Sequence, residues 1–369
     1  MSKAKFTIKQ ISDASGVSVG TVDRYIHNRG HLSSQSRAKI ESAISKLESI
    51  SSNPVSEIGN ASYVGVAKVR IGITYPFVEP SFYEKIRVGI DRIANVLSDS
   101  LELVEIRTPS HDISAQAETI QKLINVHLVS GLLIAPVNDN YSIQLESCIP
   151  KGFPYATLID DTLGCNRIFH IGPNSYAMGA LCAKLLYLYM QAGLKEVNAA
   201  IISPSATVSG TQERISGFRN MIRTSDMHIN IVAIRTIDEL EISDIGEQVY
   251  NTAMDLIRSF PELNAIYVTY GFGEWAARAV NNSGMRGIIK VICHESSPQV
   301  LSYIEKDIII AAIDQKPAQQ WYNAVMLMYQ TLSGKAQIQN KYISAECRLI
   351  TKETIPLCND LPIPGIPIN

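Results

Sequence analysis

Residues 16–30 read GVSVGTVDRYIHNRG, and this stretch determines how the amino-terminal segment folds. Gly16 can adopt the left-handed backbone conformation that ends a helix, and Ser18 is of a residue type that commonly starts one. The pattern therefore predicts a short helix over residues 8–14, a turn at Gly16 and a second helix over residues 19–27.

The flanking residues supply a start for the first helix and a third helix behind it. Thr7 and Gln10 have the spacing of a capping box, in which each side chain bonds to the backbone amide of the other residue. Ser33 or Ser34 is expected to cap a third helix with apolar residues on one face. The expected core of the three helices consists of Ile8, Ile11, Val17, Val22, Ile26, Leu32, Ile40, Ile44, Leu47 and Ile50.

Charge is distributed unevenly along the chain. Residues 1–50 contain eight Lys and Arg against four Asp and Glu, which gives a net charge of +4. The whole chain has a net charge of -2, so the remaining residues carry -6. A small basic module joined to a larger acidic body indicates that the module binds a polyanion.

The composition is that of a globular protein with more than one domain. The chain has 369 residues, 46% hydrophobic and 18% charged, and this length implies two or three domains. Six cysteines form no CxxC pair and no cluster with histidine, so we expect buried free thiols and no metal or other cofactor. The first ten residues, MSKAKFTIKQ, contain no apolar run, and no stretch of about 18 apolar residues occurs. We expect a cytoplasmic protein without membrane contact.

From Arg70 onward, apolar strands alternate with amphipathic helices. The strands are expected at residues 70–75, 101–106, 131–136, 154–159, 167–172, 198–203, 229–234, 264–269, 290–294 and 309–313. The helices are expected at residues 83–97, 114–127, 175–191, 212–223, 244–259, 274–283 and 317–333. This alternation predicts an α/β fold with doubly wound parallel sheets. Because about 290 residues are too many for one sheet, we expect two lobes, with ligands beyond the carboxyl ends of the strands.

Catalytic loops are missing where such a fold would carry them. No GxGxxG loop, no GxxxxGKS/T loop and no GxSxG nucleophile elbow follows a predicted strand, and HExxH does not occur. These patterns supply the phosphate cradle, the nucleophile or the metal ligands of many α/β enzymes. We therefore do not expect an enzyme.

The amino-terminal motif as a whole resembles the DNA-binding headpiece of LacI/GalR-type transcription regulators. The matching residues read TIxxISxxSGVSxxTVxRxIxN from Thr7 and LSxxSRxxI from Leu32. The resemblance implies that residues 19–27 form the recognition helix in the major groove, with Val19, Gly20 and Arg24 at base-reading positions. Arg24 can donate two hydrogen bonds to guanine, Val19 offers only apolar contact, and Gly20 has no side chain.

The same resemblance implies further DNA contacts, chiefly to phosphates, which fix the register but carry no sequence information. The residues at these positions are Thr7, Ser18, Thr21, His27, Asn28, His31, Ser33 and Ser36. One headpiece offers few base contacts, so a homodimer on a near-palindromic double-stranded operator is expected.

Two features depart from the family pattern. Asp23 stands where the family usually has serine. Three alternatives are open for its carboxylate: an ion pair with Arg24 or Arg29, acceptance of a hydrogen bond from a cytosine amino group, or simple exposure on the helix surface. After the headpiece, the family has a hinge helix that inserts a leucine into the minor groove, but Gly59 takes that position here. Ile58 is a candidate wedge, or else the linker stays flexible because Gly and Asn are poor helix formers.

The body resembles the type I periplasmic sugar-binding proteins, whose fold forms the effector domain of LacI/GalR regulators. The resemblance is carried by PSFY at residues 80–83 with Gly89 beyond it, by RISGF at residues 214–218, and by polar residues after the strands. The effector-binding residues that it implies are Phe82, Tyr83, Asp160, Asp161, Asn174, Arg214, Tyr270, Glu295 and Gln315.

These residue types suit a polyhydroxylated ligand. Charged and amide groups bond vicinal hydroxyls, and aromatic faces pack on the C–H faces of a sugar ring. Arg214 is expected to donate hydrogen bonds to ligand oxygens. Phe82 or Tyr83 is expected either to stack on the sugar ring or to belong to the core. One of Asp160 and Asp161 is expected to cap a turn. Tyr270 and the following glycine stand where the family often has Asn-Asp, which argues against a simple neutral hexose or pentose.

The combination predicts a ligand-responsive repressor of transcription. A sugar or sugar derivative between the lobes is expected to change lobe closure and hence operator affinity. The expected domains are a headpiece over residues 1–50, a linker over 51–69, a two-lobed body over 70–355 and a proline-rich tail over 356–369. The alternative is a sugar-binding protein of transport or chemoreception, against which the headpiece argues; an enzyme on the same lobes is a third hypothesis.

Overall fold

The computed structural model divides into two compact units, Met1–Gly65 and Val66–Asn369. It describes residues 8–27, 29, 32–51, 68–76, 80–108, 112–137, 142–162, 164–190, 196–204, 209–225, 227–237 and 244–357. Thr7 of the expected capping box, Ile58 and Gly59 of the expected hinge, and the tail from residue 358 lie outside the described residues. The three boundaries between the four expected segments stay predictions.

The first unit is a three-helix headpiece. Its helices are α1 (Ile8–Ser15), α2 (Val19–Ile26) and α3 (Ser34–Ser51). Gly16, between α1 and α2, has a φ of 65°, the left-handed conformation that the sequence predicts for it. Ile11, Val22 and Ile40 are buried at the centre, and the other described members of the expected core pack around them. The side chains of Leu47 and Ile50 lie outside the described part.

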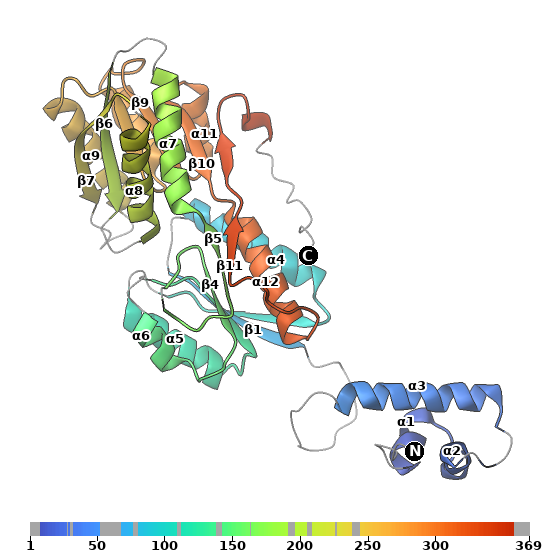
Figure 1. Cartoon of the computed structure of the whole chain (residues 1–369). Helices are drawn as coiled ribbons and strands as arrows, with labels where there is room; N and C mark the ends of the chain where they lie inside the picture. Colours follow the sequence, from blue (N-terminus) through green and yellow to red (C-terminus); the bar gives the residue numbers. More distant parts are fainter. Residues whose placement is uncertain are drawn as a thin grey trace. The chain divides into compact units, whose positions relative to one another are not determined.

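Lobe 1 of the second unit has a six-stranded sheet with the strand order β11-β5-β4-β3-β1-β2 (Figure 1). Its strands are β1 (Val69–Thr74), β2 (Leu101–Glu105), β3 (Gly131–Ile134), β4 (Tyr155–Leu158), β5 (Phe169–Pro173) and β11 (Tyr342–Ala345). Its helices are α4 (Pro80–Val96), α5 (Ile113–Asn125), α6 (Ser142–Cys148) and α12 (Pro317–Leu332). The strand pairings are parallel, as the alternation of strands and helices predicts.

Two helix layers cover the two faces of this sheet. Leu133 packs in the cluster that includes α4 and α12, whereas its neighbours Leu132 and Ile134 pack in the cluster that includes α5 and α6. Successive side chains of a strand point to opposite faces, so a continuous apolar run serves both layers. Gly89 lets α4 and α12 approach closely, because a Cβ there would collide with the carbonyl oxygen of Ala318.

Lobe 2 repeats this design with the strand order β12-β10-β9-β8-β6-β7. Its strands are β6 (Val197–Pro204), β7 (Ile229–Ile237), β8 (Ala265–Val268), β9 (Lys290–His294), β10 (Ile309–Asp314) and β12 (Arg348–Ile350). Its helices are α7 (Ser175–Met190), α8 (Ser209–Thr224), α9 (Ile245–Ser259), α10 (Gly273–Asn282) and α11 (Pro298–Glu305). The pairings are parallel except that β12 runs antiparallel to β10. The predicted two-lobed fold of parallel sheets is confirmed.

Three crossings between the lobes occur within the described residues. They lie between β5 and α7, between β10 and α12, and between β11 and β12 (Figure 1). The last crossing was not expected, because β11 alternates exposed and half-buried residues and contains no apolar run. The helices α6 and α11, which have seven and eight residues, were also not expected.

Candidate functional site

The headpiece presents the three expected base-reading positions on one exposed surface. Val19, Gly20 and Arg24 of α2 are exposed, and the side chain of Val19 is 54% accessible. Val22 of the same helix is completely buried. An exposed valine next to a glycine has no packing role here, so this end of α2 is free to contact a partner.

Serine hydroxyls cluster at the starts of α2 and α3. Ser18 Oγ lies 2.8 Å from Thr21 Oγ1, and Ser33 Oγ accepts a hydrogen bond of 3.1 Å from the backbone amide of Ser36. The serine at 33 is therefore the cap of α3, and both helix starts offer amide and hydroxyl donors of the kind that bind phosphate. The expected contacts Thr7, Asn28 and His31 lie outside the described residues.

Asp23 pairs with His27 and not with an arginine. Asp23 Oδ1 lies 3.0 Å from His27 Nδ1, and no ion pair within the described part of the chain joins Asp23 to Arg24 or Arg29. Residues four apart on a helix face the same side, whereas adjacent residues do not. Of the alternatives for Asp23, pairing with an arginine is not found among the described residues, and Arg24 is left available for another partner.

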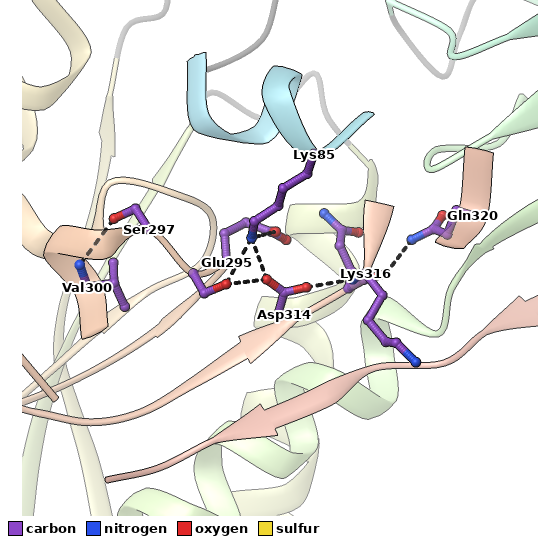
Figure 2. A network of polar contacts seen from close by, with 9 residues as sticks. Lys85, Glu295, Ser297, Val300, Asp314, Lys316 and Gln320 are labelled. Carbon is purple, nitrogen blue, oxygen red and sulfur yellow. Dashed lines mark hydrogen bonds and ion pairs between the residues drawn. The ribbon is translucent and has the colours of Figure 1, made fainter. Parts of the chain in front are cut away.

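In the body, Lys85 reaches from α4 of lobe 1 to three residues of lobe 2 (Figure 2). Its Nζ donates to Asp314 Oδ2 at 2.5 Å and to Ser296 Oγ at 2.9 Å, and it lies 3.9 Å from Glu295 Oε2. Asp314 ends β10, while Glu295 and Ser296 follow the neighbouring strand β9. The cluster therefore stands at the carboxyl ends of parallel strands, where this type of fold binds its ligands.

Asp314 is held in place from two further directions. Ser296 Oγ donates to its Oδ2 at 2.5 Å, and the backbone amide of Lys316 donates to its Oδ1 at 2.7 Å. Burial alone would raise the pKa of Asp314, but Lys85 and these hydrogen bonds outweigh burial and hold the pKa below its ordinary value. Asp314 is therefore a carboxylate at neutral pH.

Glu295 is the strained and incompletely paired member of the cluster. Its φ is 64°, a backbone conformation that glutamate rarely adopts, and both carboxyl oxygens are buried without a hydrogen-bond partner among the described residues. Burial raises its pKa, Asp314 raises it further, and Lys85, Arg214 and Gln315 act in the opposite direction; the resulting pKa is about 8. Strain of this kind is typical of functional sites.

Arg214 is buried in lobe 2, where α8 faces the strand ends. Its Nη1 donates to the carbonyl oxygen of Thr269 at 2.7 Å, and its Nε is buried with no partner among the described residues. The other two positions of the RxxGF motif serve packing: a Cβ at Gly217 would collide with the backbone of α7, and Phe218 stacks on Tyr267 at 4.9 Å between ring centroids. The motif thus presents one guanidinium and fixes the helix that carries it.

The two aspartates after β4 have different surroundings. Asp160 accepts a hydrogen bond from the backbone amide of Gly210 in α8, and so connects lobe 1 to lobe 2. Burial raises its pKa, and Arg214 and the Gly210 bond partly offset that rise. Asp160 therefore belongs to the same charged region as Arg214.

Asp161 is occupied by partners within lobe 1. Its carboxylate forms an ion pair with Arg167, accepts from Thr157 Oγ1 at 2.8 Å and lies 3.6 Å from His170 Nδ1. The guanidinium of Arg167 also lies 4.5 Å from the ring centroid of Tyr342 in β11. These contacts give Asp161 a structural task between β4, β5 and β11.

The aromatic residues proposed as effector contacts pack against other side chains of the chain. Phe82 and Tyr83 pack on the core of lobe 1, and the guanidinium of Arg107 lies 4.3 Å from the ring centroid of Tyr83. A cation over the ring occupies one of its faces. In lobe 2, Tyr270 is partly buried and packs on Phe272 at 5.6 Å between centroids.

Two further candidates have defined local roles. Asn174 Oδ1 accepts from the amide of Ala177 at 2.9 Å and so caps α7 at the first crossing between the lobes. The carbonyl of Gln315 accepts from Gln320 Nε2 at 2.6 Å, while its side chain is buried and its Oε1 has no partner in the described part of the chain. Gln315 therefore stays a candidate for ligand contact, and Asn174 is mainly a helix cap.

Sequence reasoning missed Lys85, Ser296 and Asp314. Each lies one or two residues from a predicted contact: Lys85 follows Tyr83 by two positions, and the other two adjoin Glu295 and Gln315. Their adjacency to strand ends was visible, but the pairing of a lysine in α4 with acids more than 200 residues away was not.

Reactive side chains deeper in lobe 2 are held neutral. Tyr267 Oη lies 2.8 Å from His294 Nε2, and Cys182 Sγ lies 3.7 Å from the same nitrogen. Burial raises the pKa of Cys182 to about 12 and, with Arg214, keeps the pKa of His294 well below its ordinary value. Within the described residues, no three His, Cys, Asp or Glu side chains are grouped to hold a metal, and no helix there is long and apolar enough to cross a membrane.

A helix-turn-helix unit followed by a two-lobed α/β body with charged strand ends defines a class: DNA-binding regulators that respond to a small ligand. Comparison with known families agrees. Residues 71–336 match the periplasmic binding protein domain, and residues 7–50 match the bacterial regulatory proteins of the lacI family. The chain belongs to the lacI family of regulators with a periplasmic-binding-protein domain, and it is a DNA-binding transcription regulator.

Transcription regulators of other bacteria resemble the chain over most of its length. It is 20% identical to the probable HTH-type transcriptional regulator EndR of Paenibacillus polymyxa, over 63% of the chain and 66% of that protein. It is 21% identical to MalR of Streptococcus pneumoniae, over 71% of the chain and 75% of MalR. It is also 21% identical to the ribose operon repressor of Bacillus subtilis, over 79% of the chain and 82% of that repressor.

Solved structures share the fold of the body. One is GanP, a glucose-galactose binding protein from Geobacillus stearothermophilus, with a TM-score of 0.69 at 21% identity, covering 78% of the chain and 99% of GanP. Another is a carbohydrate transporter solute binding protein from Agrobacterium radiobacter in complex with D-arabinose, with a TM-score of 0.70 at 16% identity, covering 78% and 96%.

Proposed function

We propose that the chain is a repressor that binds a near-palindromic operator as a homodimer. A carbohydrate-type effector binds between the lobes and changes the affinity for the operator, either as an inducer or as a corepressor. The observation that carries this proposal is the charged cluster at the strand ends, to which both lobes contribute. Lys85 and Asp160 come from lobe 1, and Arg214, Glu295 and Asp314 come from lobe 2.

The chemistry of the cluster supports a polar, hydrogen-bonding effector. The buried Nε of Arg214 and the buried Oε1 of Gln315 lack partners in the described part of the chain, and such groups are costly unless a ligand or water satisfies them. The relatives support the same kind of effector: one is a repressor of a ribose operon, and the solved structures include a complex with D-arabinose. Arg214, Gln315, Glu295 and Asp160 are the residues that we assign to effector contact.

The three crossings supply the route from effector to DNA. A ligand that contacts both lobes favours one angle between them, and the crossings are the segments that must bend. Lys316 Nζ bonds Glu346 Oε2 at 3.0 Å and so ties the second crossing to the third. In a dimer, a change of lobe angle alters the spacing of two headpieces and hence their fit to successive major grooves.

A pair of substitutions separates the two activities. Arg24→Ala should cost about 1–3 kcal/mol per half-site and relax preference at one base pair, without changing effector affinity. Arg214→Ala should weaken effector binding at least about tenfold, because a charged hydrogen bond is worth about 1.5–3 kcal/mol, and leave operator affinity unchanged.

The measurement is fluorescence anisotropy of operator fragments together with calorimetry on a sugar panel, using one preparation of each variant. Arg258→Ala, in an exposed pair with Asp255 on α9, is the matched control and should change neither activity. Equal losses for all DNA sequences would remove Arg24 from base reading, and unchanged sugar affinity would remove Arg214 from the effector site.

A further inference from the structure

The acids of lobe 2 form a ready-made site for one ammonium group. Nζ of Lys85 occupies it, with Asp314 Oδ2 at 2.5 Å, Ser296 Oγ at 2.9 Å and Glu295 Oε2 at 3.9 Å (Figure 2). Asp314 does not depend on Lys85 alone for its position, because Ser296 Oγ donates to its Oδ2 and the backbone amide of Lys316 donates to its Oδ1. The site would therefore persist if the lysine left.

Three buried acceptor oxygens around this point have no donor among the described residues. Both carboxyl oxygens of Glu295 are buried without a hydrogen-bond partner among the described residues, and so is Oε1 of Gln315, a side chain that is only 5% exposed. An ammonium group has three donors, no acceptor and the positive charge that the Asp314 carboxylate requires. A hydroxyl supplies one donor, and an anion would be repelled by Asp314.

The cation that occupies this site comes from the other lobe. Lys85 belongs to α4 of lobe 1, whereas Asp314, Ser296 and Glu295 belong to lobe 2. Any opening of the lobes that admits a ligand carries the lysine away and leaves the carboxylate of Asp314 without its cation. An unpaired carboxylate in a partly buried site favours a cation from solution, so the opened lobe 2 selects for a ligand that carries one.

We propose that Asp314, Ser296 and Glu295 form an ammonium subsite of the effector site. Lys85 fills this subsite when no effector is bound. The effector is a polar small molecule with a primary amino group, such as an amino sugar, and its amino group takes the place of the lysine. This inference rests on the proposed effector site between the lobes. Asp314 is paired with an ammonium group both before and after the exchange, so the exchange carries no large net electrostatic cost.

Chemical rescue tests the subsite without knowledge of the natural effector. Lys85→Ala removes three methylene groups and the ammonium, which propylammonium replaces atom for atom. Propylammonium chloride should raise the melting temperature of full-length Lys85→Ala in a saturable manner, compared with tetramethylammonium chloride at equal ionic strength, which has no N–H donor. The parent chain and the double variant Lys85→Ala, Asp314→Asn should show no such rise. Equal responses of all three proteins would overturn the proposal.

Matched sugars test the same subsite in the parent chain, including the case in which Lys85→Ala does not fold. The pairs are D-glucosamine and D-glucose, D-galactosamine and D-galactose, and D-mannosamine and D-mannose, with the N-acetyl forms as uncharged controls. At least one amino sugar should bind about tenfold tighter than its hydroxyl and N-acetyl counterparts, as expected for a charged hydrogen bond, and Asp314→Asn should abolish the difference. Neutral sugars that bind as tightly as their amino forms in every pair would overturn the inference.

The two proposals fail in different experiments. If a neutral sugar binds and changes operator affinity while no amine is preferred, only the ammonium subsite is lost. If the chain binds no operator DNA, the proposed repressor function is lost, whereas the rescue of Lys85→Ala by propylammonium still reports on the subsite.

Discussion

Each lobe places an acidic cluster next to the crossings, and the two clusters are paired in opposite ways. In lobe 1, Asp161 finds Arg167, Thr157 and His170 within its own lobe. In lobe 2, the cation that pairs with Asp314 comes from the other lobe, and Glu295 has no hydrogen-bond partner among the described residues. The first cluster is complete in any arrangement of the lobes, and the second is complete only when they are closed.

The difference separates a structural role from a responsive one. A charge group that is satisfied within one rigid body contributes to stability but cannot report a change of lobe angle. A group whose partner lies across a movable boundary couples its own ionisation and pairing to that angle. On this basis, we assign Asp161 to the framework of lobe 1 and the cluster of lobe 2 to the switch.

Arg167→Ala should have the largest effect on stability. It removes the buried guanidinium that pairs with Asp161 and leaves a carboxylate that is 14% exposed without its cation. Breaking a buried pair in this way costs about 3–5 kcal/mol. Urea unfolding at pH 7 measures it, with Arg258→Ala in an exposed pair as the control. A loss below 1 kcal/mol would show that Asp161 rearranges freely, and the contrast between the clusters would then disappear.

The fold was largely predictable from the sequence because most of the predicted strands are buried apolar runs. The ten predicted strands all occur, with ends that differ by at most three residues, and the helices between them follow the same alternation. The two edge strands β11 and β12 were not predicted, since they are short and gain their hydrogen bonds from sheets formed by distant parts of the chain. Local pattern does not encode such pairings.

The site was predictable only as a set of positions. Glu295 and Gln315 were found because they follow strands, yet the sequence did not show that Asp161 is occupied by Arg167 or that Asn174 caps α7. Lys85 was missed because its role depends on a contact with Asp314 in the other lobe. A sequence motif specifies which residues stand at strand ends, and tertiary packing decides which of them remain free for a ligand.

Lys85→Met should have the next largest effect, with a different signature. Loss of the bonds from Lys85 to Asp314 should cost about 1.5–3 kcal/mol. Part of that cost is avoidable, because lobe 2 can hydrate its acids when the lobes open. Small-angle scattering should therefore show a larger radius of gyration for Lys85→Met than for the parent chain. No expansion, combined with a loss as large as that of Arg167→Ala, would make the pair structural.

Glu295→Gln should change how stability depends on pH. The pKa of Glu295 is about 8 in the folded chain and about 4.5 in its ordinary state, so between these values the folded chain keeps a proton that the unfolded chain releases. Stability of the parent therefore falls as pH rises through this window, by up to about 1.4 kcal/mol per pH unit. Glutamine does not titrate, so the variant should gain about 2 kcal/mol on the parent between about pH 6 and 7.5. Parallel urea-unfolding curves at both pH values would mean that Glu295 is already ionised.

Glu346→Gln should have the smallest effect on stability. It tests whether an ion pair near the crossings stabilises the fold even when it is exposed to water. Glu346 is 61% exposed and bonds Lys316 at 3.0 Å, so it forms an ion pair between two crossings much as Lys85 and Asp314 form one between two lobes. Water and salt screen an exposed pair, and such pairs contribute about 0–1 kcal/mol. The loss on substitution should stay below about 1 kcal/mol and vanish at high salt, whereas the loss for Lys85→Met should persist because Asp314 is buried. Urea unfolding of both variants at low and high salt decides the matter: equal salt sensitivity would show that burial does not distinguish the two pairs.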